Sequence, residues 1–543
     1  MATAPPPTND EKPCPAAAVD QPGNLILTGE DIEESNQHHH PSGENGIPKA
    51  SSAAPGPTSV HSVFSTAQRR YIVVCASWAA FFSPVSANIY LPALNTIARD
   101  LSVSNSMINL TVTSYMIFQG LAPMFWGDFA DTAGRRPAIL LCFTIYMCAN
   151  IGLALQENYV ALFLLRCLQS AGSSPTIALS MGIIADIATS AQRGSYIGWA
   201  TAGSLMGPAL GPVMGGLLSQ YLGWRSIFWF LVIFAGVFMA QFAILFPETG
   251  RNIVGNGSIP PQKWNVSVIT YMKTRKSAHT APEEDTTLPR PKLRFPNPIK
   301  SLSILLHPDA FIVLLANALM FAAFYDMTVT IPSAFAEIYG YNDFQIGLCY
   351  LPIGVGATLA SIASGFILDY NYRRISKQHG IPVDRTKQQD LRHFPIEKAR
   401  LQVTFPLLFL SVCVIVCFGW TLHFRKSVAA PLVLLFIGGG TLTASVNTVS
   451  ALLVDLHPGK AATVTASNNL VRCLFGAGAT AVLSPMTSRL GRGWCFTLIA
   501  FVMCLTVPMM LVVIRLGPKW REERYVKTQE REAARAAEPA QKV

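Results

Sequence analysis

Charged residues are scarce in this chain. Asp, Glu, Lys and Arg together make up 13% of its 543 residues, whereas 50% of the residues are hydrophobic. A typical soluble domain carries roughly 25% charged residues, because charge keeps its surface in water. The composition therefore excludes an ordinary soluble protein and indicates an integral membrane protein.

Sequence signatures of several enzyme classes are also missing. No segment fits the phosphate-loop pattern G-x-x-x-x-G-K-[ST], so ATP is not expected to be the energy source within this chain. Histidines such as His307, His423 and His457 are too scattered for a metal-ligand cluster. The run His38 to His40 could bind a metal, but it lies in a low-complexity tract. We therefore expect a protein that is not an enzyme and has no metal and no cofactor.

The eleven cysteines show no paired spacing, and nearly all lie in apolar stretches. This pattern excludes a disulfide or zinc framework. Cys413 and Cys417 share one helix face, where small side chains usually serve packing.

Long apolar runs are what the sequence has in abundance. A helix needs roughly 20 apolar residues to cross the hydrocarbon core of a bilayer. Such runs lie at about residues 71–94, 106–126, 138–156, 159–184, 195–219, 225–246, 310–332, 346–368, 402–423, 430–452, 463–485 and 495–516. A transmembrane β-barrel would need shorter segments of alternating polarity. The sequence thus predicts an all-α membrane protein with twelve transmembrane helices.

Basic residues in the connections predict the orientation. The connections after the second, fourth, sixth, eighth and tenth runs are the basic ones, with Arg135, Arg193, Lys273, Arg373 and Lys460 as examples. The positive-inside rule then puts both termini in the cytoplasm, and we expect a multi-pass protein of the plasma membrane. Loop topology explains the net charge of +10 better than a nucleic-acid partner does. Basic residues after the last run could contact anionic lipid: Lys519, Arg521, Arg524 and Lys527.

Composition also divides the chain. Residues 1–69 are rich in Pro, Ala, Ser and Gly and are expected to form a disordered cytoplasmic tail. The Pro-rich, basic residues 247–307 form a central cytoplasmic loop that separates a six-helix bundle at 70–246 from a second one at 308–517. Residues 518–543 are a basic cytoplasmic tail.

The two predicted bundles repeat each other. Gly127, Asp131, Arg135 and Arg136 recur at the same spacing as Gly365, Asp369, Arg373 and Arg374, an offset of 238. Asp186 and Asp455 are 269 apart, and one insertion after Arg374 explains the larger offset. A chain with two related halves usually has its site between them at the midplane of the membrane.

Two motifs in the first half resemble those of a known family. The segment from Gly127 to Arg136 resembles the loop signature of the major facilitator superfamily. Arg166, Gln169 and Gly172 resemble the fourth-helix motif of that family, although Ser170 stands where the family usually has Gly. The resemblance implies two pseudo-symmetric six-helix bundles in the major facilitator fold.

Further segments narrow the resemblance. The run from Gly203 to Gly216 resembles the glycine-proline motif of the superfamily's antiporters, and the similarity covers about residues 70 to 520. It is closest to fungal members of the twelve-span drug:proton antiporter family. Segments such as Asn88-Ile89-Tyr90 and Phe394-Pro395-Ile396-Glu397 resemble fungal exporters of organic acids such as citrate and itaconate, and also quinidine or polyamine exporters.

The loop signature allows two interpretations. One is a basic anchor with a turn at the membrane edge. The other, which the resemblance implies, is a cytoplasmic latch in which Asp131 meets the N-terminal end of the eleventh span. We favour the latch because Asp131 recurs at Asp369. The predicted latch residues are Gly127, Asp131, Gly134, Arg135, Arg136, Asp369 and Arg373.

The fifth predicted span carries glycine at every fourth position. Such spacing puts a flat stripe on one helix face, and its simplest role is close helix packing. Two prolines in the run can kink the span and so influence how the cavity closes. The residues of this predicted antiporter motif are Gly203, Gly207, Pro208, Gly211, Pro212, Gly215 and Gly216.

Charge inside the predicted spans marks the candidate functional residues, because a charge at the bilayer centre costs on the order of 3 kcal/mol. Arg472 could anchor an anionic or polar substrate, or form a structural salt bridge. Arg166 has the same two alternatives, and the resemblance implies a part in proton transfer. Asp326 could carry a proton, or it could sit near the outer interface.

Polar and aromatic residues on cavity-lining spans complete the predicted substrate and proton pathway: Asn88, Tyr90, Gln119, Arg166, Tyr325, Asp326, Asn447, Asn468, Asn469 and Arg472. The amides among them could instead serve as hydrogen-bond links between helices. We expect a monomeric secondary transporter that uses the proton gradient to export a small organic acid or secondary metabolite. A broad multidrug or polyamine:proton antiporter is one alternative, and a ligand-sensing receptor with a transporter fold is another.

Overall fold

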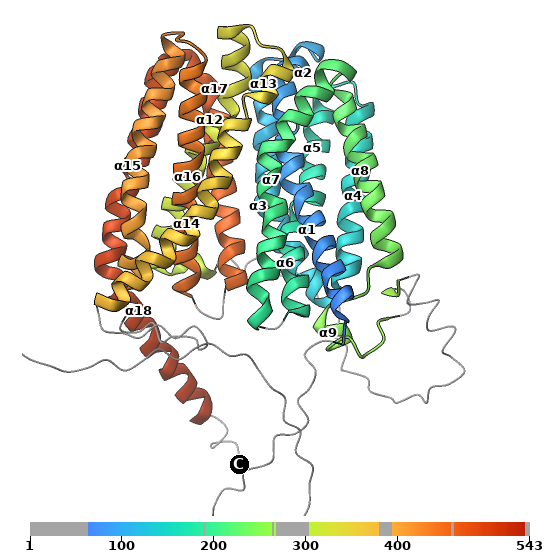
Figure 1. The fold of residues 1–543 in the computed structure, drawn as a ribbon, viewed down its shortest axis with the longest axis vertical. Coiled ribbons are helices and arrows are strands. Elements are labelled where there is room, and N and C mark those ends of the chain that lie inside the picture. Colours follow the sequence, from blue (N-terminus) through green and yellow to red (C-terminus); the bar gives the residue numbers. More distant parts are fainter. Residues whose placement is uncertain are drawn as a thin grey trace, which may run out of the picture. The chain divides into compact units, whose positions relative to one another are not determined.

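The structure is a computed structural model that describes residues 63–188, 190–262, 265–267, 303–378, 394–457 and 461–537, which are helices and connections without a strand. The helical elements of the first half run from α1 to α9 (Figure 1). They are α1 (Thr66–Asn88), η1 (Leu91–Ala93), α2 (Leu94–Asp100), α3 (Asn105–Ala133), α4 (Arg135–Leu155), α5 (Tyr159–Ser173), α6 (Pro175–Ile187), α7 (Ser190–Leu222), α8 (Arg225–Leu245) and the short α9 (Arg251–Val254).

The second half begins with η3 (Ser303–Leu306). It continues with α12 (Pro308–Tyr339), α13 (Asp343–Leu348), α14 (Leu351–Gln378), α15 (Ile396–His423), α16 (Ala429–Asp455), α17 (Ala461–Cys504) and α18 (Thr506–Ala537). Helix α18 therefore continues through residue 517, where the sequence predicted the second bundle to end.

Eight helical stretches of the described residues are long and apolar enough by themselves to cross a membrane. The last of them, Thr463–Lys527, contains two crossings, because Gly491 interrupts it with φ 76° and ψ 162°. Helix α3, the pair α5 and α6, and α7 supply the remaining crossings. The prediction of an all-α membrane protein with twelve transmembrane helices is thus confirmed.

Several crossings differ in detail from the predicted runs. The fourth consists of α5 and α6, which meet at Ser174 because Pro175 has no N–H to continue the hydrogen bonding. The first extends beyond residue 94, as α1 is followed by η1 and by α2, which ends at Asp100. Local breaks of this kind leave the run apolar, so hydropathy alone did not reveal them.

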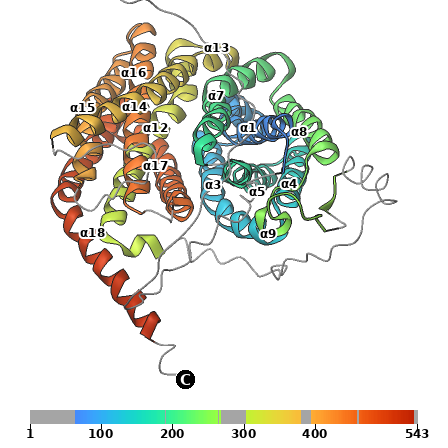
Figure 2. The same cartoon turned by 60° about the horizontal axis from the view of Figure 1, so that its bottom comes forward.

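The helices of each half pack on one another, and among the described residues a cluster of buried apolar side chains extends through both halves as the core. In the first half α4 and α8 pack together, and α5 packs against α3 and α4, as Figure 2 shows. Aromatic rings fill this core: Phe82 lies 4.6 Å from Phe234 and Phe143 lies 4.6 Å from Phe238, between ring centroids. In the second half α14 packs on α16, α15 on α16, and α12 on α17.

The halves meet along α3 and α17. Asn469 Nδ2 donates to the Gln119 carbonyl oxygen at 2.9 Å, and the hydroxyls of Thr113 and Thr480 lie 3.1 Å apart. These contacts continue to the end of the helices that lies away from the loop of Gly127 to Arg136. We call the end with that loop the motif end and the other the opposite end.

Candidate functional site

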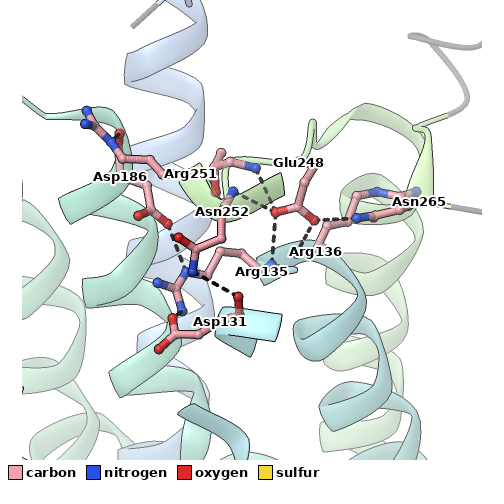
Figure 3. Close-up of polar contacts among 10 residues, drawn as sticks. Asp131, Arg135, Arg136, Asp186, Glu248, Arg251, Asn252 and Asn265 are labelled. Atoms are coloured by element: carbon pink, nitrogen blue, oxygen red, sulfur yellow. Dashed lines mark hydrogen bonds and ion pairs between the residues drawn. The ribbon is translucent and has the colours of Figure 1, made fainter. Parts of the chain in front are cut away.

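The loop signature at the motif end forms a charged network (Figure 3). Gly134 ends α3 with φ 116°, a conformation that favours glycine, and α4 begins at the next residue. Arg135 forms ion pairs with Asp131 (Nη1 to Oδ1, 2.7 Å) and with Asp186 on α6 (Nε to Oδ2, 2.9 Å). Arg136 is buried, and its Nη2 donates to the Ala243 carbonyl oxygen at 2.8 Å. The motif thus ties the ends of α3, α4, α6 and α8 together.

Glu248 is a member of this network that was not predicted as a site residue from the sequence, although the segment Pro247-Glu248-Thr249 contributes to the family resemblance. Its carboxylate accepts hydrogen bonds from the backbone N–H groups of Arg135 at 2.9 Å and Arg136 at 3.2 Å, and from Asn265 Nδ2 at 2.7 Å (Figure 3). A carboxylate at a helix N-terminus satisfies free N–H groups and complements the helix dipole. A Cβ at Gly134 would lie 2.5 Å from Glu248 Oε2, so this position also needs glycine for space. An acidic residue directly after the sixth apolar run was the signal that could have revealed it.

The described part of the latch places Asp131 at the surface. Its side chain is 51% exposed and pairs with Arg135 in its own loop. Helix α17, the predicted partner, is described only from Ala461 on, and residues 458–460 before it lie outside the described residues. A contact between Asp131 and the start of the eleventh span stays a prediction.

The second copy of the signature has a different conformation from the first. Tyr372 occupies the position equivalent to Gly134, and α14 continues as a helix to Gln378. Asp369 and Arg373 are exposed and form no ion pair with any residue that the structure describes. Without the second glycine, the repeated charges remain on a helix surface and no equivalent loop forms.

The glycine stripe of α7 packs against α1. A Cβ would lie 2.4 Å from Pro84 Cβ if built on Gly207, 3.3 Å from Asn88 Cβ on Gly211, and 1.8 Å from the Ile89 carbonyl oxygen on Gly215. The other face of α7 meets the second half, where a Cβ on Gly216 would lie 2.4 Å from the Asp343 carbonyl oxygen. Pro208 and Pro212 lie inside the same helix, and Gly203 belongs to a part of it whose side chains are not described. Helix α7 therefore packs between α1 and the second half, and its glycine positions leave no room there for a larger side chain.

Arg166 lies at the centre of the first half. It is 1% exposed, and its guanidinium carbon lies 4.2 Å from the ring centroids of both Tyr90 and Tyr115. Arg166 Nη1 donates to Gln169 Oε1 at 2.5 Å, and Gln169 Nε2 donates to Asn150 Oδ1 at 2.7 Å. Two aromatic faces and an amide chain thus hold this charge, and no described carboxylate lies within ion-pair distance of it.

Arg472 of α17 is a second cation, in the other half. Its Nη2 donates to Asn469 Oδ1 at 2.8 Å, and its guanidinium carbon lies 4.9 Å from the Phe321 ring centroid. The side chain is partly exposed, and among the described residues no carboxylate pairs with it. Asn469 at the same time bonds α3 through Gln119, so Arg472 is oriented by the contact between the halves.

Neighbouring side chains link the surroundings of the two arginines across the α3 and α17 interface. A Cβ on Gly476 of α17 would lie 2.5 Å from Met116 and 3.5 Å from Phe321, so these helices are in close contact here. Tyr115, which covers Arg166, and Tyr325 of α12 are near enough to influence each other electrostatically, and Tyr325 also lies near Arg472. The structure thus brings Tyr90, Arg166, Tyr325 and Arg472 to one region, together with Gln119 and Asn469.

Other predicted pathway residues make contacts within one half. Asn88 Nδ2 donates to the Pro84 carbonyl oxygen, and Asn447 Nδ2 donates to Ser361 Oγ at 2.6 Å. Asn468 accepts from Asn317 Nδ2 at 2.7 Å. Asp326 is 4% exposed, and its Oδ1 has no hydrogen-bond partner among the described residues. It lies on a different face of α12 from Tyr325.

The described residues contain no group of three or more His, Cys, Asp or Glu side chains that could hold a metal ion. The arrangement offers instead one buried and one partly exposed cation, an aromatic lining and amide groups at the contact between two bundles. Such a site can bind and orient a small polar molecule.

Comparison with known proteins identifies the family. A model described as Major Facilitator Superfamily matches residues 76–480. The chain belongs to the major facilitator superfamily. It is 44% identical to MFS-type transporter phiD of Fungal sp. (strain ATCC 74256), over 96% of this chain and 80% of that protein. It is 37% identical to Citrate exporter 1 of Aspergillus niger, over 86% of this chain and 89% of that protein.

Solved structures agree with this assignment of the fold. The chain resembles the crystal structure of a D-xylose-proton symporter with a TM-score of 0.59 and 14% identity, over 81% of this chain and 96% of that one. Major facilitator proteins are transporters that bind small molecules, so this protein is a multi-pass membrane transporter and not an enzyme. The predicted family, fold class and transport function are confirmed at this level.

Proposed function

We propose that this transporter exports a small organic acid in exchange for protons. Two six-helix bundles, at about residues 70–246 and 308–517, would rock about a site at the midplane and expose it alternately to each side. The proposal needs a site for an anion, a group that carries a proton, and contacts that close each end in turn.

The observation that carries the proposal is a pair of arginines inside the helical bundles, of which Arg166 is buried and Arg472 is partly exposed. Arg166 and Arg472 come from different halves, and neither has a carboxylate partner within ion-pair distance among the described residues. A buried charge is stable only with compensation, and a bound carboxylate on the substrate would supply it. Because each arginine belongs to one half, an anion between them would also sense the relative position of the two halves.

The similarity to Citrate exporter 1 supports an organic acid as the substrate. The alternative of a polyamine exporter is less compatible with the site, because two fixed positive charges would repel a polyamine. A broad multidrug exporter would need a site without such strong charge selection.

Basic loops support the proposed orientation. Under the positive-inside rule the motif end faces the cytoplasm, as do both termini, and the plasma membrane is the membrane through which an exporter would act. Basic residues of α18 such as Lys519 and Lys527 would then lie near anionic lipid headgroups. The protein would function as a monomer.

Asp326 is the proposed proton carrier. Its carboxylate is buried on α12 without a partner for Oδ1, and an ionised carboxylate in such a place is costly. Binding a proton removes that cost, so occupancy by a proton would change with access to water. Asp326→Asn should uncouple transport from the pH gradient, and a variant with full gradient dependence would exclude Asp326 from the proton path.

Contacts at the opposite end support a closed state on that side. Asp343 of α13 accepts hydrogen bonds through Oδ2 from the hydroxyls of Thr96 (2.7 Å) and Ser219 (2.5 Å), both in the first half. Asn95 Nδ2 donates to the Pro332 carbonyl oxygen at 2.7 Å. The proposed latch around Asp131 would stabilise the alternate state, in which the motif end is closed.

Flux in sealed vesicles tests the proposal. Purified protein in liposomes with an imposed pH gradient is offered citrate, itaconate, spermidine or a cationic drug. We expect gradient-driven movement of the acids and none of spermidine. Movement of the cations alone would favour the polyamine or multidrug alternative, and binding without turnover would favour a receptor.

A further inference from the structure

A second polar region lies at the opposite end, away from the arginines. It is a cavity of about 520 Å³ between α2, α3, α12, α15 and α17, open on one side. Most of its lining is polar, including the side chains of Asn105, Asn109, Ser484 and Ser488. A polar cavity of this size holds water, because it offers several hydrogen-bond partners.

One stripe of α12 connects this cavity with Asp326. Thr330, Ser333 and Glu337 line the cavity and follow Asp326 by four, seven and eleven residues. Residues at these spacings share one face of a helix. Asp326 therefore lies on the cavity face, one turn deeper, and Thr330 Oγ1 donates to its backbone oxygen at 2.8 Å.

Helix α17 faces the same stripe from the other side. Thr487 lines the cavity, and its hydroxyl lies 3.4 Å from the Cys495 thiol beyond the Gly491 turn. Cys495 is buried and lies within electrostatic range of Asp326. Thr330 and Thr487 line the cavity on the two helices that carry Asp326 and Cys495, and we call this pair the polar floor.

The arginine site lies on another face of α12. Phe321 and Tyr325, which contact or approach Arg472, precede Asp326 by five residues and one residue. At 100° per residue, Asp326 is rotated about 140° from Phe321 and about 100° from Tyr325. Helix α12 therefore separates the arginine site from the stripe that carries Asp326.

We propose that the cavity at the opposite end is a water-filled proton route to Asp326, entered over the polar floor of Thr330 and Thr487 and separate from the arginine site. The route rests on the proposed proton coupling and adds where the proton enters. Protons would reach the carboxylate on one face of α12 while the substrate anion occupies the other. The helix itself would couple the two events.

Charged and titratable groups around the route fit this role. Glu337 and Arg492 pair with each other at 2.5 Å near the entrance, and His423 and Arg425 lie on the cavity wall at the end of α15. Further from the cavity, the titratable group near Asp326 is the thiol of Cys495 on α17. The entrance charges are partly neutralised by pairing, so a proton is not excluded from the cavity.

Chemical modification tests access to Asp326 without any transport. A water-soluble carbodiimide and an amine are added to the side of vesicles that the cavity faces, and modified Asp326 is quantified by peptide mass spectrometry. We expect modification in the wild type and at least a fivefold decrease in the Thr330→Val/Thr487→Val variant, which keeps side-chain volume but removes the hydroxyls. Thr358→Val on α14, outside the cavity, is the matched control and should match the wild type. An unmodified Asp326 in the wild type, or equal modification in the double variant, would overturn the proposal.

Transport assays then separate the route from the proposed function. The double valine variant should lose about tenfold in proton-driven citrate flux and keep citrate–citrate exchange at the wild-type rate, because exchange needs no net proton movement. Equal loss in both assays would contradict a dedicated proton route. A wild type that moves no citrate in either assay would instead contradict the proposed function, and the modification experiment would still decide the route.

Discussion

Arg400 forms an ion pair with Asp455, with 2.9 Å between Nε and Oδ2, just as Arg135 pairs with Asp186 over 2.9 Å in the first half. Asp455 follows Asp186 by 269 residues and Arg400 follows Arg135 by 265. The aspartate of the repeated ion pair thus has the larger offset of the repeat, and its arginine lies four residues before the position with that offset. Arg373, which the loop signature matches at an offset of 238, is not its partner.

A second contact at the motif end repeats with its charges exchanged. In the first half Glu248 follows the sixth crossing and binds the start of α4. In the second half Arg521, after the last crossing, pairs with Glu397 at the start of α15 over 3.6 Å. Each half therefore ties its third helix to its last, by a carboxylate in one case and a guanidinium in the other.

The repeated ion pair predicts unequal effects of two arginine substitutions. Arg400→Ala should lower the free energy of unfolding by about 1–3 kcal/mol, because it leaves the half-buried Asp455 without its partner. Arg373→Ala removes an exposed side chain and should change it by less than about 0.5 kcal/mol. Unfolding of both variants in detergent measures the difference in the free energy of unfolding. It is followed by a fluorescence signal that does not depend on labelling of cysteines. Equal destabilisation would show that the signature copy around Arg373 matters for stability after all.

Close packing of α7 on α1 predicts that Gly215 cannot be replaced. Gly215→Ala would put a methyl group 1.8 Å from the Ile89 carbonyl oxygen, so we expect destabilisation by about 1–3 kcal/mol or a failure to fold. Gly478→Ala is the control, because a Cβ there meets no atom within 4 Å and alanine favours a helix. The yield and thermal stability of the two purified variants should differ clearly. A Gly215→Ala protein as stable as the control would mean that α1 and α7 pack less closely.

Asp343 predicts how the opposite end opens. Asp343→Ala removes the acceptor for the Thr96 and Ser219 hydroxyls and should favour separation of the halves at this end by about tenfold. Cys349, buried at the end of α13, is a native reporter whose maleimide labelling should accelerate accordingly. Asp343→Asn keeps an acceptor oxygen and should label at nearly the wild-type rate. Identical labelling of the alanine variant would argue against a role of Asp343 in closure.

His457 predicts a pH dependence of stability. Burial, together with the nearby charge of Arg524, lowers the pKa of His457 from 6.5 to about 4, with Asp309 and His307 as the other titratable neighbours. The unfolded chain therefore takes up this proton first, and the stabilising contribution present above pH 6.5 is lost as pH falls toward 4. Melting temperatures of the wild type and His457→Gln should converge or cross over this range. A constant difference between pH 7 and pH 4 would contradict a buried, neutral His457.

The fold followed from the sequence because hydropathy and repeated motifs act over long segments. The twelve runs needed only length and composition, and the Gly127 to Arg136 signature fixed the family. The pairing of Arg400 with Asp455 was not predictable from the motif, because the replacement of glycine by Tyr372 changes a loop into a helix. The backbone conformation at Tyr372 therefore accompanies a change of partner, in which Asp455 pairs with Arg400 and not with Arg373.

The candidate site was predictable only in part. Arg166 and Arg472 stood out because charge in an apolar run is costly, and the structure brings them to one region. Asn88, Asn447 and Asn468 looked equally polar in sequence, yet Asn88 bonds its own helix and the other two bond neighbouring helices of the same half. The separation of Asp326 from Tyr325 depends on helix rotation and on which neighbours each face meets. Because the two residues are adjacent in sequence, their different surroundings become visible only once the helices packed against α12 are known.

Binding of citrate to purified protein is the most direct test of the anion site between the two halves. Isothermal titration of the wild type is compared with Arg472→Gln and with Arg374→Gln, an exposed arginine at the motif end. We predict that Arg472→Gln weakens citrate binding by at least tenfold while membrane insertion stays intact, and that Arg374→Gln binds like the wild type. Wild-type affinity in the Arg472→Gln protein would contradict the proposed role of the arginines.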